Sequence, residues 1–179
     1  MAVKILLNEI KVSIILSRLC QQLIERHKDF SNVVLVGLQP RGTTLLEQLL
    51  KLLKEQGLKS IKSGKLDITF FRDDFRRNDE PLYAKTTEMS ETLEGKDVVL
   101  IDDVLFTGRT VRSAIDALMP FGRPNRIELL TLIDRRFQRQ LPIEPNYVGK
   151  KVDSIDSEKV IVNIDSRENL KNILILKST

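Results

Sequence analysis

The stretch from Val98 to Thr110 does most to limit what this chain can fold into. It runs from four apolar residues into Asp102 and Asp103, and then through a short apolar bridge into a turn that contains Gly108. An unbroken apolar run predicts a strand covered on both faces, as in a parallel sheet, because a half-exposed strand would alternate. The two carboxylates then lie at the carboxyl end of that strand, where open α/β sheets bind their ligands.

A helix is predicted directly after this turn. The residues at its apolar positions are spaced by three and four, and they are Val111, Ile115, Leu118 and Met119. The turn therefore lies at a helix N-terminus, where free N–H groups and the helix dipole favour a phosphate. Gly108 lets the backbone approach the anion, and Thr107 and Thr110 add hydroxyl donors. A ribose 5-phosphate would explain the adjacent carboxylates, which can accept hydrogen bonds from its hydroxyls directly or through hydrated Mg²⁺.

The same stretch resembles a known signature. Its order of branched apolar strand, two acids, apolar bridge and Thr-Gly-x-Thr is similar to the site where type I phosphoribosyltransferases bind phosphoribosyl pyrophosphate (PRPP). The resemblance implies that Asp102 and Asp103 are catalytic and hold Mg²⁺, directly or through water. It also implies a 5-phosphate loop made of Val104, Leu105, Phe106, Thr107, Gly108, Arg109 and Thr110. Two other interpretations stay open: the acids cap a turn, or they form a receiver-like acid pocket, which would lack this loop.

A second strand and turn repeat the pattern. The apolar run Val33–Leu38 ends in a polar turn, and leucines at helical spacing follow, with Thr43 or Thr44 as the expected helix cap. Arg41 adds a fixed charge with donors suited to a phosphate. The resemblance implies a pyrophosphate site made of Gln39, Pro40, Arg41 and Gly42. From the residues alone, an ordinary strand-to-helix turn fits as well.

A polar segment follows the predicted strand Leu66–Phe71. Residues Arg72–Glu80 include a single hydrophobe, so we expect an exposed loop, and the residues alone fit a plain solvated turn. An enzyme that forms a glycosyl cation must exclude water, however, and the segments that do so come from weakly stable parts of a chain. The resemblance implies a flexible hood loop over about residues 72–86, in which Arg72, Arg76 and Arg77 face pyrophosphate.

The remaining pattern fits an α/β fold. A first helix is predicted after Asn8 as N-cap, and its apolar face is made of Val12, Ile15, Leu16, Leu19, Leu23 and Ile24. Further strands are predicted at Arg126–Asp134 and Val160–Ile164, whereas residues 173–176 fit a last strand or a packed tail. With the resemblance, this order implies the type I phosphoribosyltransferase fold, a central and mostly parallel sheet flanked by helices.

The composition supports one globular domain. The chain has 179 residues, of which 41% are hydrophobic and 30% charged, so we expect a single phosphoribosyltransferase domain over residues 1–179. No apolar run approaches the roughly 20 residues of a transmembrane helix, and no signal-peptide core is present, so a cytoplasmic protein without a membrane partner is expected. Cys20 is the single cysteine, which excludes an internal disulfide.

Motifs along nearly the whole chain narrow the resemblance to one branch of the family. They include Leu66-Asp67-Ile68-Thr69, Asn78-Asp79-Glu80-Pro81, Gly122-Arg123-Pro124, Leu141-Pro142-Ile143 and Tyr147-Val148-Gly149-Lys150. These look like hallmarks of the pyrimidine operon attenuation regulators that are also uracil phosphoribosyltransferases. The resemblance implies transfer of phosphoribose from PRPP to uracil, which forms UMP and releases pyrophosphate, and it implies homodimers or larger homo-oligomers. In some members it also implies binding of a leader RNA in response to UMP.

The same resemblance assigns two further surfaces. The base site comprises Asp134, Arg135, Arg136 and Val160, and the RNA surface comprises Ser17, Arg18, Arg26 and Lys150. The loop after Asp134 is one residue longer than in many relatives, and Gln21 and Glu144 replace a histidine and a basic residue. A net charge of +4 needs no partner beyond anionic ligands. Three activities therefore stay open: a uracil transferase, an RNA-binding attenuator with little catalysis, or a transferase for another base such as a purine.

Overall fold

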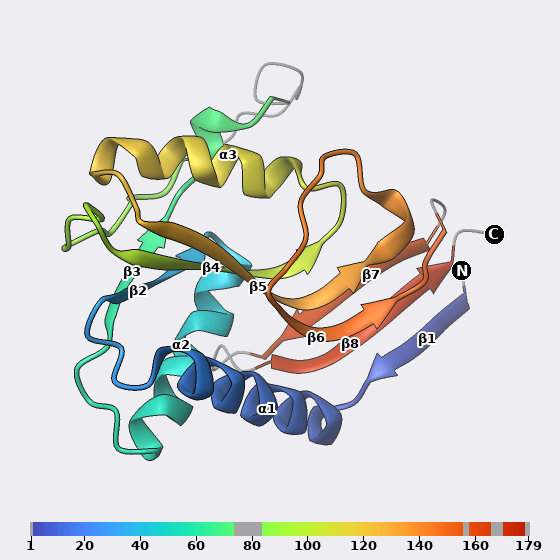
Figure 1. Cartoon of the computed structure of the whole chain (residues 1–179). Coiled ribbons are helices and arrows are strands. Elements are labelled where there is room, and N and C mark those ends of the chain that lie inside the picture. Colours follow the sequence, from blue (N-terminus) through green and yellow to red (C-terminus); the bar gives the residue numbers. More distant parts are fainter. Residues whose placement is uncertain (1, 74–83, 156–157, 166–169, 178–179) are drawn as a thin grey trace.

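A five-stranded parallel sheet forms the centre of the computed structural model, which describes residues 2–73, 84–155, 158–165 and 170–177 (Figure 1). Its strands, in spatial order, are β3 (Lys62–Leu66), β2 (Val33–Leu38), β4 (Asp97–Leu105), β5 (Arg126–Arg135) and β6 (Tyr147–Val152). All six residues of β2 are buried, as expected for a strand covered on both faces. The predicted α/β fold, with its mostly parallel sheet flanked by helices, is confirmed.

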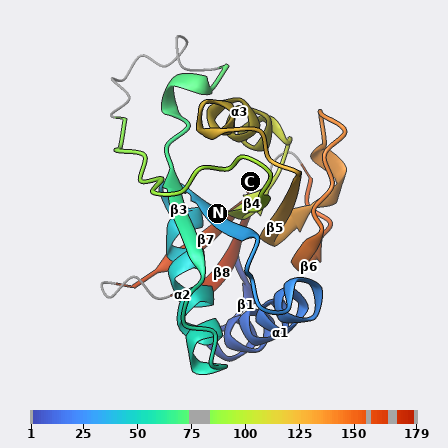
Figure 2. The same cartoon turned by 60° about the vertical axis from the view of Figure 1, so that its left-hand side comes forward.

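Helices cover both faces of this sheet. They are α1 (Glu9–His27), α2 (Arg41–Glu55) and α3 (Arg109–Leu118), with short 3₁₀ turns η1 (Thr69–Phe71), η2 (Met119–Phe121) and η3 (Arg136–Gln138). Helices α1 and α2 lie on one face and α3 lies on the other (Figures 1 and 2). Successive residues of β2 therefore pack in different layers: Leu35 packs in the layer of α1 and α2, and Val36 packs in the layer of α3.

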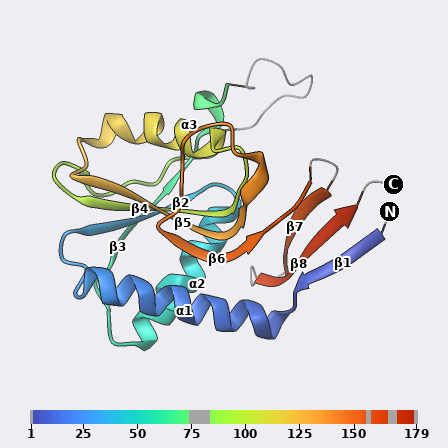
Figure 3. The same cartoon turned by 45° about the vertical axis from the view of Figure 1, so that its right-hand side comes forward.

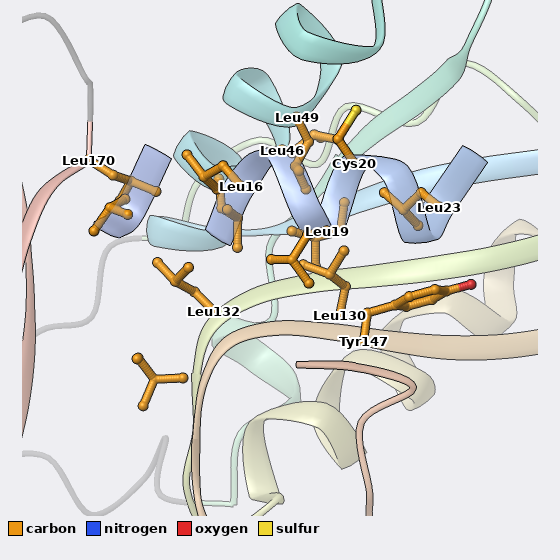
Figure 4. Close-up of a cluster of buried hydrophobic side chains, with 14 of the residues drawn as sticks. Leu16, Leu19, Cys20, Leu23, Leu46, Leu49, Leu130, Leu132, Tyr147 and Leu170 are labelled. Carbon is orange, nitrogen blue, oxygen red and sulfur yellow. The ribbon is translucent and has the colours of Figure 1, made fainter. Parts of the chain in front are cut away.

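The larger core layer is mainly aliphatic. Figure 4 shows Leu19 and Leu23 of α1 close to Leu130 of β5, with Leu46 and Leu49 of α2 nearby. Each of these leucines is at most 1% exposed, and burial of one such side chain stabilises a fold by about 1.5–3 kcal/mol. The single cysteine packs in this layer too, and its burial raises the pKa of the thiol.

A second, three-stranded sheet joins the two ends of the chain. Strand β8 (Leu170–Lys177) lies between β1 (Ala2–Leu7) and β7 (Glu158–Ile164), and both pairings are antiparallel. Figure 3 shows this sheet beside the central one, with β1 and β8 next to each other. Of its strands, only β7 was predicted outright. The apolar residues at both ends are too few to indicate a strand until their distant partner is known.

The prediction of a strand at Leu66–Phe71 is wrong. Strand β3 ends at Leu66, because the Asp67 carboxylate accepts hydrogen bonds from the N–H and the hydroxyl of Thr69 and turns the chain into η1. The expected threonine cap of α2 is also wrong. The helix begins at Arg41, and the Thr43 hydroxyl donates to the Pro40 carbonyl at 2.6 Å. By contrast, the Asn8 cap of α1 is confirmed by a 3.0 Å hydrogen bond from Lys11 N–H.

A buried ionic cluster fixes the end of α1 to the amino end of the central sheet. Glu128 of β5 is 2% exposed, and its carboxylate accepts from the Tyr147 hydroxyl at 2.6 Å. His27 Nε2 lies 3.1 Å from the same carboxylate, and Arg26 pairs with its other oxygen at 3.1 Å. Because the cluster lies at the opposite ends of the strands from Asp102, it serves the fold and not the carboxyl-end crevice.

The strand order places that crevice. From β2 the chain moves outward to β3, and then it returns to form β4 on the other side of β2. This reversal is a topological switch point, where the loops after neighbouring strands diverge and leave room for a ligand. In the part of the chain that the structure describes, no helix is both long and apolar enough to cross a membrane.

Candidate functional site

Two buried carboxylates lie at the switch point. Asp102 and Asp103 of β4 are each 8% exposed. Asp102 Oδ1 accepts the Asp103 N–H at 3.0 Å, and Asp103 Oδ1 accepts the Val104 N–H at 2.9 Å. Asp103 Oδ2 is buried without a hydrogen-bond partner among the described residues, and it lies 3.7 Å from Arg41 Nη1. An unpartnered carboxylate oxygen of this kind is suited to a ligand hydroxyl or a cation.

The environment of this pair disfavours negative charge. Burial raises the pKa of Asp102 well above its ordinary range, and the charge of Asp103 raises it further. Burial also raises the pKa of Asp103, and the guanidinium of Arg41 offsets part of that effect. Strongly perturbed acids in a cleft are typical of functional sites, since their interactions are met only when a ligand arrives.

A cavity of about 570 Å³ opens between the ends of β2 and β4. Neighbouring side chains of a strand usually point to opposite faces, but both acids line this cavity. The other predicted residues at its wall are Gln39, Pro40, Arg41, Arg72, Val104 and Thr110. Its wall also includes Asp67, Ile68, Thr69 and Lys85, to which the sequence assigned no site role. Asp67 gave one usable signal, because an acid two residues before a threonine favours a tight turn.

The predicted phosphate loop lines a second cavity of about 290 Å³. It shares Arg72, Asp102, Val104 and Thr110 with the first cavity, so the two are neighbours. Gly108 has φ +92°, a conformation that favours glycine, and it is the N-cap of α3. Thr107, Gly108, Arg109 and Thr110 thus gather at the positive end of a helix dipole, which is where a phosphate binds best.

Two glycines let α2 pack closely on the sheet: Gly42 brings the helix against β4, and Gly37 of β2 brings the helix against β2. A Cβ at Gly42 would lie 2.2 Å from the Ile101 carbonyl oxygen, and a Cβ at Gly37 would lie 2.9 Å from Thr43 Cα. The first turn of α2 can therefore touch the strand that holds the acids. Arg41, in that first turn, reaches Asp103 for this reason.

The residues assigned to the base lie apart from both cavities. Asp134 pairs with Arg139, and Arg136 forms a bidentate pair with Asp153 at 2.7 Å. Arg135 is 6% exposed, and its guanidinium lies 4.0 Å from the centre of the Phe106 ring. Val160 is buried in β7. None of the four assigned residues is at the walls of the two cavities in the described ranges.

The remaining predicted residues are placed as follows. Arg76 and Arg77 lie outside the described residues. The Ser17 hydroxyl donates to a carbonyl of its own helix, and Lys150 is exposed on β6. Arg18 donates to the Val148 and Gly149 carbonyls, at 3.1 and 2.5 Å.

The acid pair is the candidate for holding a metal ion at this site. The structure, within its described ranges, contains no group of three or more histidine, cysteine, aspartate or glutamate side chains placed to hold a metal ion. Asp102 and Asp103 fit an ion that takes most of its ligands from water and substrate, as Mg²⁺ does. The free Oδ2 of Asp103 is the observation behind this fit.

Comparison with known proteins agrees with this geometry. The family model for the phosphoribosyl transferase domain matches residues 2–167. The bifunctional protein PyrR of Haemophilus ducreyi is 41% identical over 177 residues, covering 98% of each chain. The PyrR of Enterococcus faecalis is 41% identical over 162 residues, covering 90% of each chain. The chain belongs to the PyrR branch of the phosphoribosyltransferase family.

Solved structures place this PyrR chain in the same fold. A hypoxanthine phosphoribosyltransferase from Staphylococcus aureus superposes with a TM-score of 0.68 at 26% identity, over 95% of this chain and 90% of the other. The hypoxanthine phosphoribosyltransferase of Trypanosoma cruzi gives a TM-score of 0.73 at 17% identity, which shows the fold alone, over 98% and 97% of the two chains. As a PyrR protein, the chain is a phosphoribosyltransferase and regulator of that type.

Proposed function

We propose that this chain transfers phosphoribose from PRPP to uracil, forming UMP and releasing pyrophosphate. One observation supports this above the others: a buried acid pair, an arginine-bearing helix start and a phosphate-type loop line two neighbouring cavities at the switch point. This order of groups along the two cavities suits PRPP, which presents hydroxyls between two phosphate groups. Uracil as acceptor rests on the branch of the family to which the chain belongs.

The N-terminus of α3 binds the 5-phosphate in this proposal. The backbone N–H groups around Gly108 and the hydroxyls of Thr107 and Thr110 donate to its oxygens. The acids then lie beside the ribose ring, since Asp102 lines both cavities. A hydroxyl donated to Asp103 Oδ2 would satisfy the oxygen that has no partner.

Departure of pyrophosphate builds positive charge on the ribose and negative charge on the leaving group. The acid pair stabilises the first, and Arg41 and Arg72 at the cavity wall stabilise the second. Asp102 and Asp103 would hold Mg²⁺, directly or through water, and the ion would neutralise pyrophosphate charge. We place the base beside the carboxyl end of β5, near Asp134, Arg135, Arg136 and Val160, and the loop arginines Arg76 and Arg77 toward pyrophosphate.

A base panel tests the reaction. The protein is incubated with PRPP, Mg²⁺ and either uracil, hypoxanthine or guanine, and pyrophosphate release is followed. We expect release with uracil alone, and a loss of turnover of about 100-fold or more in Asp103→Asn, on the scale of one preorganised electrostatic group. Release with a purine only would make the chain a transferase for another base. Near-normal turnover of Asp103→Asn would remove that acid from the mechanism.

A UMP-responsive RNA-binding role is the second candidate, and one observation favours it. Because Arg18 is fixed to the carbonyls of Val148 and Gly149, its charge lies at the same surface as Lys150. Ser17 precedes it on α1. Arg26 is less suited to a phosphate, since it neutralises the buried Glu128. A homo-oligomer would multiply such a surface, and each phosphate contact steepens the salt dependence of binding.

The RNA test therefore uses an Arg18→Ala/Lys150→Ala double variant. Candidate leader RNA is titrated at two salt concentrations, with and without UMP. We expect weaker binding and a shallower salt slope, by roughly 0.7–0.9 for each lost contact. A Lys51→Ala/Lys54→Ala variant, which removes the same charge from exposed positions on α2, is the control. If both variants and wild type bind equally, or if wild type does not bind at low salt, the RNA-binding role is wrong and the proposed transferase activity alone remains.

A further inference from the structure

A short segment after η3 holds the phosphate loop from outside. Arg139 Nη1 donates to the Phe106 carbonyl at 2.5 Å. The next two residues, Gln140 and Leu141, both donate their N–H groups to the Thr107 carbonyl, at 3.0 and 3.2 Å. Two successive carbonyls of the loop are therefore bound on the same side by one segment.

Binding these carbonyls also fixes the direction of two N–H groups. In a trans peptide the C=O and the N–H of the same unit are coplanar and point in opposite directions. The only cis peptide in the described residues is Gln39–Pro40, so this rule applies to the loop. Holding the Phe106 carbonyl thus directs the Thr107 N–H away from the segment, and holding the Thr107 carbonyl directs the Gly108 N–H away from it. Thr107 and Gly108 both line the smaller cavity.

Arg139 is itself anchored and not free to contact a substrate. Its second nitrogen, Nη2, pairs with Asp134 Oδ1 at the end of β5, and the two side chains are 19% and 6% exposed. A charge-assisted pair of low exposure holds its geometry better than a surface pair does. The guanidinium thus connects the phosphate loop to a strand of the central sheet.

We propose that Arg139 is a positioning residue that aims the Thr107 and Gly108 N–H groups at the 5-phosphate of the substrate. The inference rests on the proposed function, because it needs the phosphate to bind at this loop. A purely structural arginine would lower stability without changing the affinity of the folded protein for a phosphate ester. Arg139 should instead change affinity for the phosphoribose, and it should change affinity for the base less, because it reaches the proposed base site only through Asp134.

Calorimetry with ribose 5-phosphate provides the test, and steady-state kinetics adds KM for PRPP and for uracil. Below its melting temperature, Arg139→Ala should raise the Kd for ribose 5-phosphate and the KM for PRPP by about 10- to 100-fold, and the KM for uracil by clearly less. Arg139→Lys, which keeps one donor group, should lie between Arg139→Ala and wild type. The control is Arg126→Ala, which removes an arginine paired with Asp97 at the far end of β4 and should bind as wild type does.

The outcomes separate the two proposals. If wild type does not bind ribose 5-phosphate, the phosphate site and the proposed function fail together. If wild type binds and Arg139→Ala binds equally well, Arg139 has no positioning role, whatever its melting temperature. If Arg139→Ala does not fold, Arg139→Lys decides, and a Kd equal to that of wild type overturns the inference.

Discussion

Asp102 lowers the stability of the folded protein at neutral pH, although it is suited to the candidate site. The residue is buried, beside a second acid, and its pKa is raised by burial and by that neighbour. Since the pKa of the carboxyl is higher in the folded than in the unfolded chain, the unfolded chain loses its proton at lower pH. Stability is therefore undiminished below the unfolded pKa of about 3.9 and falls as pH rises through the folded pKa.

Asp102→Asn should for this reason stabilise the protein at neutral pH. The amide keeps an oxygen to accept the Asp103 N–H and removes the buried charge. At pH 7.5 we expect the melting temperature to rise by roughly 2–4 °C, the shift that 1 kcal/mol produces in a chain of this size. The gain should shrink as pH falls toward 4.5, because the wild-type carboxyl takes up its proton. Scanning calorimetry at both pH values measures it.

The control for this substitution is Asp116→Asn, which changes an acid with a 52% exposed side chain and should show no such gain. A melting temperature of Asp102→Asn at or below that of wild type at pH 7.5 would contradict the argument. Loss of phosphoribosyl transfer in the same variant would show that the acid is kept for the site.

At the scale of elements, the contact between α2 and β4 sets the distance between charges. Gly42 has no room for a side chain, since its Cβ would lie 2.2 Å from the Ile101 carbonyl oxygen. The helix start and the strand end therefore meet with only backbone between them. Arg41 and Asp103, which come from different elements, face each other across 3.7 Å as a result.

Gly42→Ala should lower the free energy of unfolding, although replacing glycine by alanine in a helix usually raises it. In an open helical position, alanine is more stable than glycine by roughly 0.5–1 kcal/mol. Here we expect the free energy of unfolding to fall by about 1–3 kcal/mol, because α2 must move off β4. We also expect a lower turnover, because Arg41 moves away from the cavity. Urea unfolding and the pyrophosphate assay check both. Lys51→Ala, an exposed substitution on the same helix, should change neither, and an unchanged Gly42→Ala would rule out the tight contact.

For the molecule as a whole, the sequence predicted those features that depend on residues close together in the chain. Strands such as β2 and β4 were readable because they are buried on both faces and so are continuously apolar. Strand β3 was not, since Lys62 and Lys65 break the apolar pattern of a strand that lies at the edge of the sheet. The acid pair and the phosphate loop could be predicted as a candidate site because their chemistry is contiguous in sequence.

The unpredicted features depend on contacts between distant residues. Asp67 and Lys85 reach the cavity only because the segments on either side of the undescribed residues 74–83 return to each other, as the Lys85 N–H bond to Asp67 shows. The role of Arg139 depends on the packing of its segment against Phe106, which the sequence does not reveal. Periodicity and composition carry no information about which loop lies against which, so such residues require the fold.

The pairing of β1 with β8 sets an order of events during synthesis. Strand β1 is made before the other described strands, yet its partner is the last described strand to be made. Every strand of the central sheet has been translated by then, whereas β1 has had no neighbour to hydrogen-bond. In the nascent chain, β1 must therefore stay unpaired until β8 has been made. The smaller sheet can therefore form only after every described strand of the central sheet has been made.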